Sequence, residues 1–311
     1  LALFLSSPAP PSIFAGMSTV IVDELHALAG TKRGDLLALG LARLRRLARR
    51  VRSVGLSATV ADPDVLAAYL ARAPSAGAAD VRIVRGRAGA APVIDTLATR
   101  EKMPWAGHMA VHAMAEVYER IKDVRTAIVF VNTRAQAELC FQELWRVNID
   151  NLPIAIHHGS LSVEQRRKVE AAMARGELRA VVATSSLDLG IDWGSVDLVV
   201  QVGAPKGASR LIQRIGRANH RLDEPSRALL VPGNRFEYLE CRAATEAVKA
   251  HSYDGDPPAP GGLDVLAQHI LGVACSAPFA ADALYDEVRG AAPYAGLARK
   301  DVGRAGAGSD D

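Results

Sequence analysis

The chain has 311 residues, of which 49% are hydrophobic and 23% charged, and its formal net charge is +3. This length and composition predict about two globular domains with real cores, and no apolar run reaches the roughly 18 residues of a membrane span. The three cysteines lie far apart without a Cys-x-x-Cys pair, which argues against structural zinc and indicates a reducing compartment. The small positive charge is permissive of nucleic-acid binding and no more.

Residues 1 to 17 form a lead-in punctuated by Pro and Ser, in which we find no site. The chain begins with Leu rather than Met, so we expect that the front of the protein is missing. The apolar residues 1 to 5 have no basic segment before them, which argues against a signal peptide.

The next stretch is an apolar run, Val20 to Val22, which ends in Asp23, Glu24 and, after one leucine, His26. Consecutive β-branched residues without alternation predict a strand buried on both faces, and open α/β sheets bind ligands at the carboxyl ends of their strands. There, Asp23 would hold Mg²⁺ against a nucleoside triphosphate and Glu24 would orient the attacking water. The alternative is a helix start, with Asp23 as the N-cap and Glu24 in the first turn.

Residues 29 to 34 superficially resemble a phosphate-binding loop. They lack Gly-Lys-[Ser/Thr] and follow the acidic strand, so we interpret them as a connection. Apolar residues at helical spacing then predict an amphipathic helix from Asp35 to Arg50 that docks on the sheet. Its other face carries arginines that we expect to be solvated. These are Arg43, Arg45, Arg46, Arg49 and Arg50.

A second short strand is expected at residues 51 to 56, and Ser57 and Thr59 follow it. Two hydroxyls at a strand end can hydrogen-bond to the acidic pair and relay its state. They can also start a helix, with Ser57 or Thr59 as the N-cap before Asp62 and Pro63. The two interpretations are compatible, because a capping residue can also make a contact.

The pattern restarts near residues 95 to 105, where we place a domain boundary. Beyond it, buried strands alternate with helices, which predicts a second lobe built on a doubly wound parallel sheet. The expected strands are 127–131, 153–156, 179–183, 197–202 and 227–231, and the expected helices are 108–121, one ending near 145, 162–175, 208–219, 234–250, 263–275 and 282–288. The predicted division is 1–95, 96–252, a linker at 253–262, and 263–311 with a disordered tail.

Two segments of the second lobe carry groups suited to phosphate chemistry. The segment from Thr184 to Asp192 follows a buried strand with hydroxyls and backbone N–H groups, Gly190 permits a close approach, and Asp192 can accept from ribose hydroxyls. Further on, Arg214 and Arg217 are three residues apart and share a face of the expected helix. Such a pair can stabilise charge on a transferring γ-phosphoryl group, although an isolated Arg-rich helix is usually surface.

Taken together and in this order, these segments resemble superfamily 2 helicases of the DExH type. Residues 23–26 (Asp-Glu-Leu-His) match motif II, residues 57–59 (Ser-Ala-Thr) match motif III, and 128–134, 184–192 and 213–220 resemble motifs IV, V and VI. Residues 22–28, 31–35, 156–162, 202–207 and 217–221 are similar to the Lhr-type branch, and within it most of all to the bacterial ligase-associated DExH helicases. The resemblance covers about residues 1 to 300.

The resemblance implies two RecA-like P-loop lobes with parallel sheets, the first lobe incomplete, followed by the start of a winged-helix domain. It implies that Asp23 and Glu24 bind Mg²⁺ and activate water, and that His26 couples to Gln213 or its neighbours. Ser57 and Thr59 would link hydrolysis to strand movement.

The same resemblance makes Arg217 the best arginine finger, beside nucleotide contacts from Gly190 and Asp192. Arg214 is the reserve, because His220 stands where many relatives end motif VI with Arg. Adjacent histidines diverge on a strand, so we expect residues 157 and 158 to form a turn rather than a metal site. The residues implied to face nucleic acid are Asn132, Thr133, Arg134, His158, Gly159, Thr184 and Ser185.

The resemblance further implies ATP and Mg²⁺ as cofactors, and movement along single-stranded DNA with 3′ to 5′ polarity that separates duplexes or RNA:DNA hybrids. It implies a role in DNA repair in the bacterial cytoplasm, with DNA ligase and nuclease partners and no membrane. No Gly-x-x-x-x-Gly-Lys-[Ser/Thr] occurs in the 311 residues, although an ATPase of this type needs that loop. We therefore expect a chain truncated at both ends and inactive alone, with a non-hydrolysing nucleic-acid-binding module as the alternative.

Overall fold

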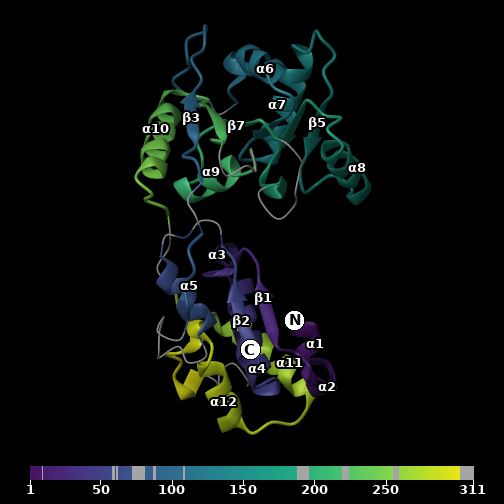
Figure 1. The fold of residues 1–311 in the computed structure, drawn as a ribbon, viewed down its shortest axis with the longest axis vertical. Coiled ribbons are helices and arrows are strands. Elements are labelled where there is room, and N and C mark those ends of the chain that lie inside the picture. The colour runs from purple at the N-terminus through teal and green to yellow at the C-terminus, as the bar shows by residue number, and fades with distance from the viewer. Residues whose placement is uncertain are drawn as a thin grey trace, which may run out of the picture. The chain divides into compact units, whose positions relative to one another are not determined.

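The computed structural model describes residues 1–8, 10–57, 60, 62–71, 81–86, 89–107, 109–187, 196–218, 224–254 and 259–301, with the side chains of residues 10 and 11 left out. The chain forms two compact units (Figure 1). The first combines Leu1–Arg85 with Gly255–Asp311, and the second is Gly86–Asp254. Within the described ranges, no helix combines the length and the apolar character that crossing a membrane requires.

The second unit is built on a six-stranded sheet in which every pair of neighbours is parallel. The strands are β3 (Val93–Thr96), β4 (Ala127–Phe130), β5 (Ile154–His157), β6 (Ala180–Ala183), β7 (Leu198–Val202) and β8 (Arg227–Val231). Their order is β3-β8-β7-β4-β6-β5. The α/β class and the parallel sheet are therefore confirmed. The edge strand β3 was not predicted, because its four half-exposed residues carry no long apolar run.

Helices cover both faces of this sheet. They are α6 (Met114–Lys122), preceded by the short turn η2 (Val111–Ala113), α7 (Arg134–Arg146), α8 (Val163–Ala174), α9 (Ala208–Ile215) and α10 (Arg235–Lys249). Val129 shares a core with Leu144 of α7, whereas its neighbour Ile128 shares a different core with Met173 of α8. Successive side chains on a strand point to opposite faces, so this strand is buried on both.

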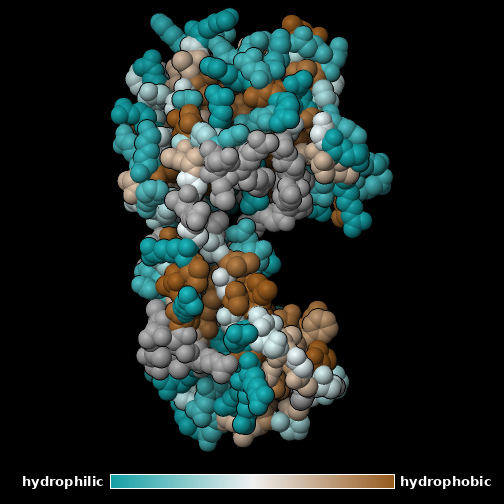
Figure 2. All heavy atoms as spheres, viewed as in Figure 1, coloured by the Kyte–Doolittle hydropathy of each residue, from teal (hydrophilic) through white to brown (hydrophobic). Residues whose placement is uncertain are grey.

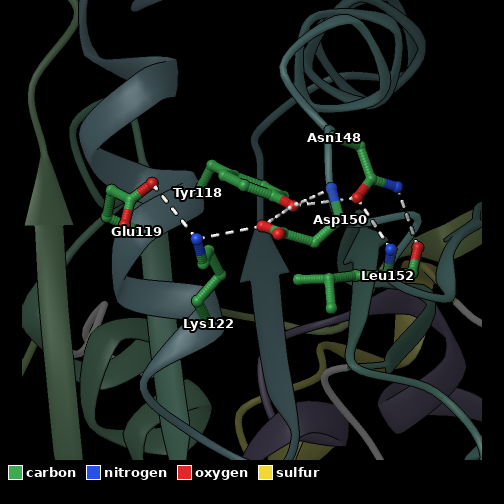
Figure 3. A network of polar contacts seen from close by, with 6 residues as sticks. All are labelled: Tyr118, Glu119, Lys122, Asn148, Asp150 and Leu152. Carbon is green, nitrogen blue, oxygen red and sulfur yellow. Dashed lines mark hydrogen bonds and ion pairs between the residues drawn. The ribbon is translucent and has the colours of Figure 1, made fainter.

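A polar network fixes the connection between α7 and β5 beside α6 (Figure 3). The Tyr118 hydroxyl lies 3.0 Å from Asn148 Oδ1 and 2.9 Å from Asp150 Oδ2. Lys122 Nζ lies 2.9 Å from the same Asp150 oxygen, and Lys122 lowers the pKa of that carboxyl. The Asn148 side chain also bonds both backbone polar groups of Leu152. The network thereby satisfies backbone groups that no strand pairs.

The first unit is organised around the long helix α4 (Lys32–Leu47). Around it pack α1 (Ala2–Leu5), α2 (Pro10–Phe14), α11 (Leu263–Ser276) and α12 (Ala281–Arg289), followed by the turn η4 (Ala292–Tyr294). Figure 1 shows α11 and α12 beside α4, although they are far from it in the sequence. Leu44 of α4 lies in one core with Leu266 and Val288. The segment after residue 262 thus shares its core with the front of the chain, and its status as a separate domain stays a prediction.

The strand before the acidic pair is only half buried. β1 (Thr19–Val22) pairs in parallel with β2 (Arg52–Gly55), and Ile21 lies opposite Val54. Ile21 is 63% exposed and Val54 41%, whereas Val22 is 6% exposed. The prediction of a strand buried on both faces is therefore wrong, because only the face of Val22 joins the core of this unit. Figure 2 shows hydrophobic residues at the surface around these strands.

The arginine face of α4 is not uniformly solvated, which corrects a second prediction. The Arg43 side chain is 13% exposed and its Nη1 lies 3.4 Å from Glu287 of α12. Arg45 donates to the carbonyl of Leu70 at 2.8 Å. The other three arginines of the set, Arg46, Arg49 and Arg50, are exposed. The helix also begins three residues earlier than expected, since Thr31 caps it by accepting from the N–H of Gly34.

Candidate functional site

The acidic pair follows the carboxyl end of β1, as predicted from the sequence. Asp23 is exposed, and its Oδ1 accepts the N–H of Glu24 at 2.8 Å. Glu24 adopts a left-handed conformation with φ 49° and ψ 43°. A side chain in this region strains the backbone by roughly 1 kcal/mol. Glu24 is the N-cap of α3 (Leu25–Leu28) without a side-chain cap bond, so the alternative in which Asp23 caps a helix is not observed.

Close packing around Gly55 holds this turn in place. Gly55 pairs with Val22 in the register of the two strands. A Cβ at Gly55 would lie 2.5 Å from Leu70 Cδ1 and 2.8 Å from Leu25 Cδ2. A side chain at this position would therefore displace Leu25 or the last residue of α5 (Pro63–Leu70) from the end of β2. The N–H of Leu25 completes the anchor by donating to the carbonyl of Leu56 at 3.0 Å.

His26 connects the acidic turn to the segment after β2. Its Nδ1 lies 2.7 Å from Ser57 Oγ, and its Nε2 lies 3.6 Å from Glu24 Oε2. Burial lowers the pKa of His26, opposed by the carboxylates of Glu24 and Asp23, so the ring is neutral at pH 7. The favoured tautomer has Ser57 donating to Nδ1 and the Nε2–H facing Glu24, because the other tautomer would point a lone pair at a carboxylate. The predicted link between Ser57 and the acidic pair thus runs through His26.

The acidic turn offers oxygen ligands of the kind that Mg²⁺ prefers. Asp23 Oδ2 has no protein partner among the residues that the structure describes, and Glu24 is half-exposed. Those residues contain no group of three or more metal-binding side chains. Mg²⁺ at a nucleotide site needs only one or two carboxylates, with phosphates and waters completing its shell. Asp23 and Glu24 therefore fit such an ion.

In the second unit, the predicted nucleic-acid residues follow three neighbouring strands. Thr133 and Arg134 come after β4, and Gly159 comes after β5. Thr184 follows β6, and Ser185 begins the short turn η3 (Ser185–Leu187). The carboxyl ends of parallel strands meet at one edge of a sheet, so the fold collects these residues along a single rim. All but the half-buried Thr184 are exposed.

Local hydrogen bonds fix the first part of this rim. Thr133 and Gln136 form a capping box at the start of α7. Asn132, which is half-buried, donates from Nδ2 to the carbonyl of Ala204 at 2.7 Å. Arg134 Nε lies 2.9 Å from Glu138 Oε1 in an exposed pair that stabilises little. The backbone of the rim after β4 is therefore fixed by hydrogen bonds, and the side chains of Thr133 and Arg134 are exposed.

The two adjacent histidines diverge, as predicted. His157 Nδ1 lies 2.8 Å from Ser186 Oγ, and its Nε2 lies 3.1 Å from Glu170 Oε1. Burial lowers the pKa of His157 despite that carboxylate. His158 points to Glu138 of α7 at 3.7 Å and is only 4% exposed. The structure thus places His158 in the interior rather than on the nucleic-acid rim, which corrects its predicted role.

Arg214 and Arg217 do not share an exposed helix face. Arg214 is 1% exposed, donates from Nη1 to Gln201 Oε1 at 2.6 Å, and lies 4.7 Å over the ring of Phe130. The helix α9 ends at Ile215, so Arg217 lies in the following turn, half-buried like Gln213. Arg214 is held in the interior because the buried Gln201 needs a hydrogen-bond partner. Arg217 is therefore the more exposed of the two arginines.

Four residues named in the sequence analysis lie outside the described part of the chain. They are Thr59, Gly190, Asp192 and His220. Gln213 belongs to the second unit and His26 to the first, so the predicted coupling between them remains a prediction.

Two domain families match the chain. The helicase conserved C-terminal domain matches residues 110–221, and the winged helix domain of the large helicase-related protein matches residues 246–304. The chain is 37% identical to the Lhr helicase/probable uracil glycosylase of Mycolicibacterium smegmatis over 337 residues, which cover 96% of the chain and 22% of that protein. It is similar to the solved structure of Mycobacterium smegmatis helicase Lhr bound to ssDNA and AMP-PNP, with a TM-score of 0.85 and 36% identity over 98% of this chain and 40% of that one.

The chain carries domains of the Lhr-type helicases. It is also 33% identical over 310 residues to the ATP-dependent helicase Lhr-Core of Methanocaldococcus jannaschii, covering 97% of this chain and 35% of that protein. The Lhr-type chain thus spans between a fifth and about a third of the length of these curated relatives. The family resemblance, the RecA-like second lobe and the winged-helix segment are confirmed. The narrower likeness to ligase-associated helicases stays a prediction.

The sequence analysis of this Lhr-type chain did not find the residues that position Arg214 and His157 by hydrogen bonds. Gln201 fixes Arg214, and Ser186 and Glu170 fix His157. One of them left a signal in the sequence, because Gln201 is the single polar residue in the otherwise apolar strand β7. A lone polar residue in a buried strand requires a partner, which predicts a buried polar contact without naming the other side.

Proposed function

We propose that this Lhr-type chain contributes the metal-binding and water-orienting carboxylates, and the second-lobe nucleic-acid rim, of an ATP-driven nucleic-acid helicase. The observation that carries the proposal is the contact chain from Glu24 through His26 to Ser57 at the carboxyl end of β1. A purely structural turn would not need a strained glutamate, a neutral histidine and an exposed serine in series.

In this proposal, Asp23 holds Mg²⁺ and Glu24 orients the attacking water. MgATP, when bound, supplies the phosphoanhydride bond whose hydrolysis drives movement. His26 holds the Glu24 carboxylate through its Nε2–H and is itself held by Ser57, so a displacement of the segment after β2 would alter the position of Glu24. Ser57, with Thr59, is therefore the coupling group between hydrolysis and strand movement.

The second lobe contributes the charge-stabilising and nucleotide-binding groups. We assign the arginine-finger role to Arg217, with Gly190 and Asp192 contacting the nucleotide. Arg214 acts as a positioning residue, since it is bonded to Gln201 beneath the turn that carries Arg217. In this proposal Arg217 keeps its predicted role, and Arg214 is no longer the reserve finger.

The rim of the six-stranded sheet holds single-stranded DNA or one strand of an RNA:DNA hybrid. Its exposed groups are hydroxyls, a guanidinium and backbone N–H groups, which contact phosphates without selecting a base sequence. The structure of the related Mycobacterium smegmatis helicase with ssDNA and AMP-PNP supports this assignment. The 3′ to 5′ polarity, the role in DNA repair and the ligase and nuclease partners are parts of the proposal that rest on the family resemblance.

A second candidate is a nucleic-acid-binding module that does not hydrolyse ATP. It is favoured by the absence of Gly-x-x-x-x-Gly-Lys-[Ser/Thr] from the 311 residues. For these residues alone, we expect salt-dependent binding of single-stranded DNA together with weak ATP affinity. Titrations with both ligands test this, and micromolar ATP binding would contradict our account of the missing loop.

The hydrolytic role is tested in protein of the relatives' full length that carries this chain. Glu24→Gln keeps the size of the side chain but removes the charge that orients water, so nucleic-acid-stimulated ATPase activity should be lost. The control is Glu164→Gln on α8, an exposed carboxylate that pairs with Lys168, which should leave the activity unchanged. Full activity in Glu24→Gln would defeat the assignment.

A further inference from the structure

A patch at the start of α10 combines exposed aromatic and aliphatic side chains with an arginine. Trp105 is 66% exposed, Phe236 64% and Leu239 61%. The Arg235 guanidinium lies 4.1 Å from the centre of the Trp105 ring. Phe236 and Leu239 are three residues apart on α10 and therefore share a face. We call Trp105, Arg235, Phe236 and Leu239 the aromatic platform.

The loop that carries Trp105 is tied to α10, so the exposure of the ring does not come from a loose segment. The N–H of Arg235 donates to the carbonyl of Pro104 at 3.1 Å. Asn234, which is 3% exposed, donates from Nδ2 to the carbonyl of Gly107 at 2.7 Å. Its Oδ1 also accepts two N–H groups of the first turn of α10. One buried asparagine thus caps the helix and fixes the loop.

The aromatic platform continues the rim on which the nucleic-acid residues lie. Only β7 separates β8, which leads into α10, from β4, which leads to Asn132. Strands lie about 4.8 Å apart, so the ends of β8 and β4 are separated by roughly 10 Å along the rim. Gly203, after β7, bridges them, since a Cβ there would lie 3.3 Å from Asn132 Nδ2 and 3.7 Å from Glu237 Oε2 of α10. The ends of β4, β7 and β8 are therefore packed against one another below the rim.

The positive charge and the exposed aromatic rings of the platform are complementary to an anionic ligand that contains aromatic rings. Among the residues that the structure describes, no carboxylate pairs with Arg235, whose charge faces the Trp105 ring and the solvent. A guanidinium beside an exposed indole can contact a phosphate while a base stacks on the indole or on the guanidinium plane. Every base has a π face, so such stacking suits a site that must accept any sequence.

We propose that the aromatic platform binds an unpaired nucleobase of the strand held on the rim, by stacking on Trp105 beside Arg235. The inference rests on the proposed nucleic-acid function and adds a base contact to a rim that otherwise offers phosphate contacts. It makes Trp105 a nucleic-acid-binding residue, and Asn234 the residue that positions it.

Fluorescence gives a direct test, because the chain has three tryptophans, at positions 105, 145 and 193. Trp145 is 56% exposed near the end of α7. That helix starts at the rim and runs back across the sheet, so Trp145 is a matched exposed indole away from the rim. Saturating oligothymidylate should quench the tryptophan fluorescence of the native chain and of Trp145→Phe. It should quench the fluorescence of Trp105→Phe much less. Equal quenching of native chain and Trp105→Phe would overturn the proposal.

Affinity measurements separate stacking from phosphate contact. Trp105→Ala should bind oligothymidylate about 10-fold more weakly with an unchanged salt slope, Trp105→Phe should recover most of the loss, and Trp145→Ala should bind normally. On an abasic strand of the same length, native chain and Trp105→Ala should bind equally. An equal loss on both strands, or no loss on either, would overturn the stacking proposal while leaving the proposed function intact. Absence of binding by the native chain would overturn both.

Discussion

The two sheets of this chain carry functional residues on very different supports. In the second unit, helices pack on both faces of a sheet of six parallel strands, and β4 is buried along its whole length. In the first unit, two strands are covered on one face, and Ile21 and Val54 are left exposed on the other. The carboxylates assigned to hydrolysis thus follow the thinner sheet, and the residues assigned to strand binding follow the thicker one.

The difference shows where the stability of each site originates. The rim of the second unit is held from within the sheet, by buried polar contacts such as that of Gln201 with Arg214. The acidic turn of the first unit is held from beside the sheet, by the packing of α3 and α5 around Gly55 and by His26. Among the described residues, the first site is therefore held by a few loop and helix contacts.

The largest expected effect comes from one matched substitution made in both sheets. Ile128→Ala removes a fully buried side chain of β4, whereas Ile21→Ala removes a side chain of β1 that is 63% exposed. We expect the first change to lower the free energy of unfolding by about 3 kcal/mol and the second by less than about 0.5 kcal/mol. Urea denaturation measures both. Similar losses would mean that the outer face of β1 is covered after all.

A smaller effect is expected from the buried polar contact of the second unit. Arg214→Met leaves Gln201 Oε1 without its donor and removes the guanidinium from the Phe130 ring, so unfolding should be easier by about 2 kcal/mol. The control is Arg167→Met on the exposed face of α8, with an expected change within about 0.5 kcal/mol. Equal denaturation midpoints for the two variants would show that Arg214 does not support the sheet.

The smallest effect is a pH dependence that both units share. Burial lowers the pKa of His26 and of His157 below the ordinary value of 6.5. Between the folded and the unfolded pKa, the unfolded chain binds more protons, so stability is complete above about pH 6.5 and falls as the pH drops below it. Thermal unfolding at about pH 7.5 and about pH 5.5 measures the loss. His157→Gln should reduce this pH dependence in the second unit, and an unchanged dependence in that variant would refute the assignment.

Five of the six strands of the second unit were predictable from the sequence because each is a short continuous run of mostly apolar residues. Ala127–Phe130 and Leu198–Val202 are examples, and in both the run reflects burial on two faces. The capping box of Thr133 and Gln136 is local as well, since its two partners are three residues apart. The acidic turn and its neighbour Ser57 were found because their chemistry is unusual for a strand end.

The tertiary structure alone decided which of these runs and charges are covered. The same β-branched pattern that is buried in β4 is half exposed in β1, because exposure depends on whether another layer packs on the strand and not on the strand itself. The half-buried Arg43 contacts Glu287, 244 residues away, and the buried Arg214 contacts Gln201, 13 residues away. Helical spacing does not predict either partner. The sequence determines which residues share a face of a strand or helix and which side chains are charged. The packing of distant segments determines whether that face is buried and which partner each charge contacts.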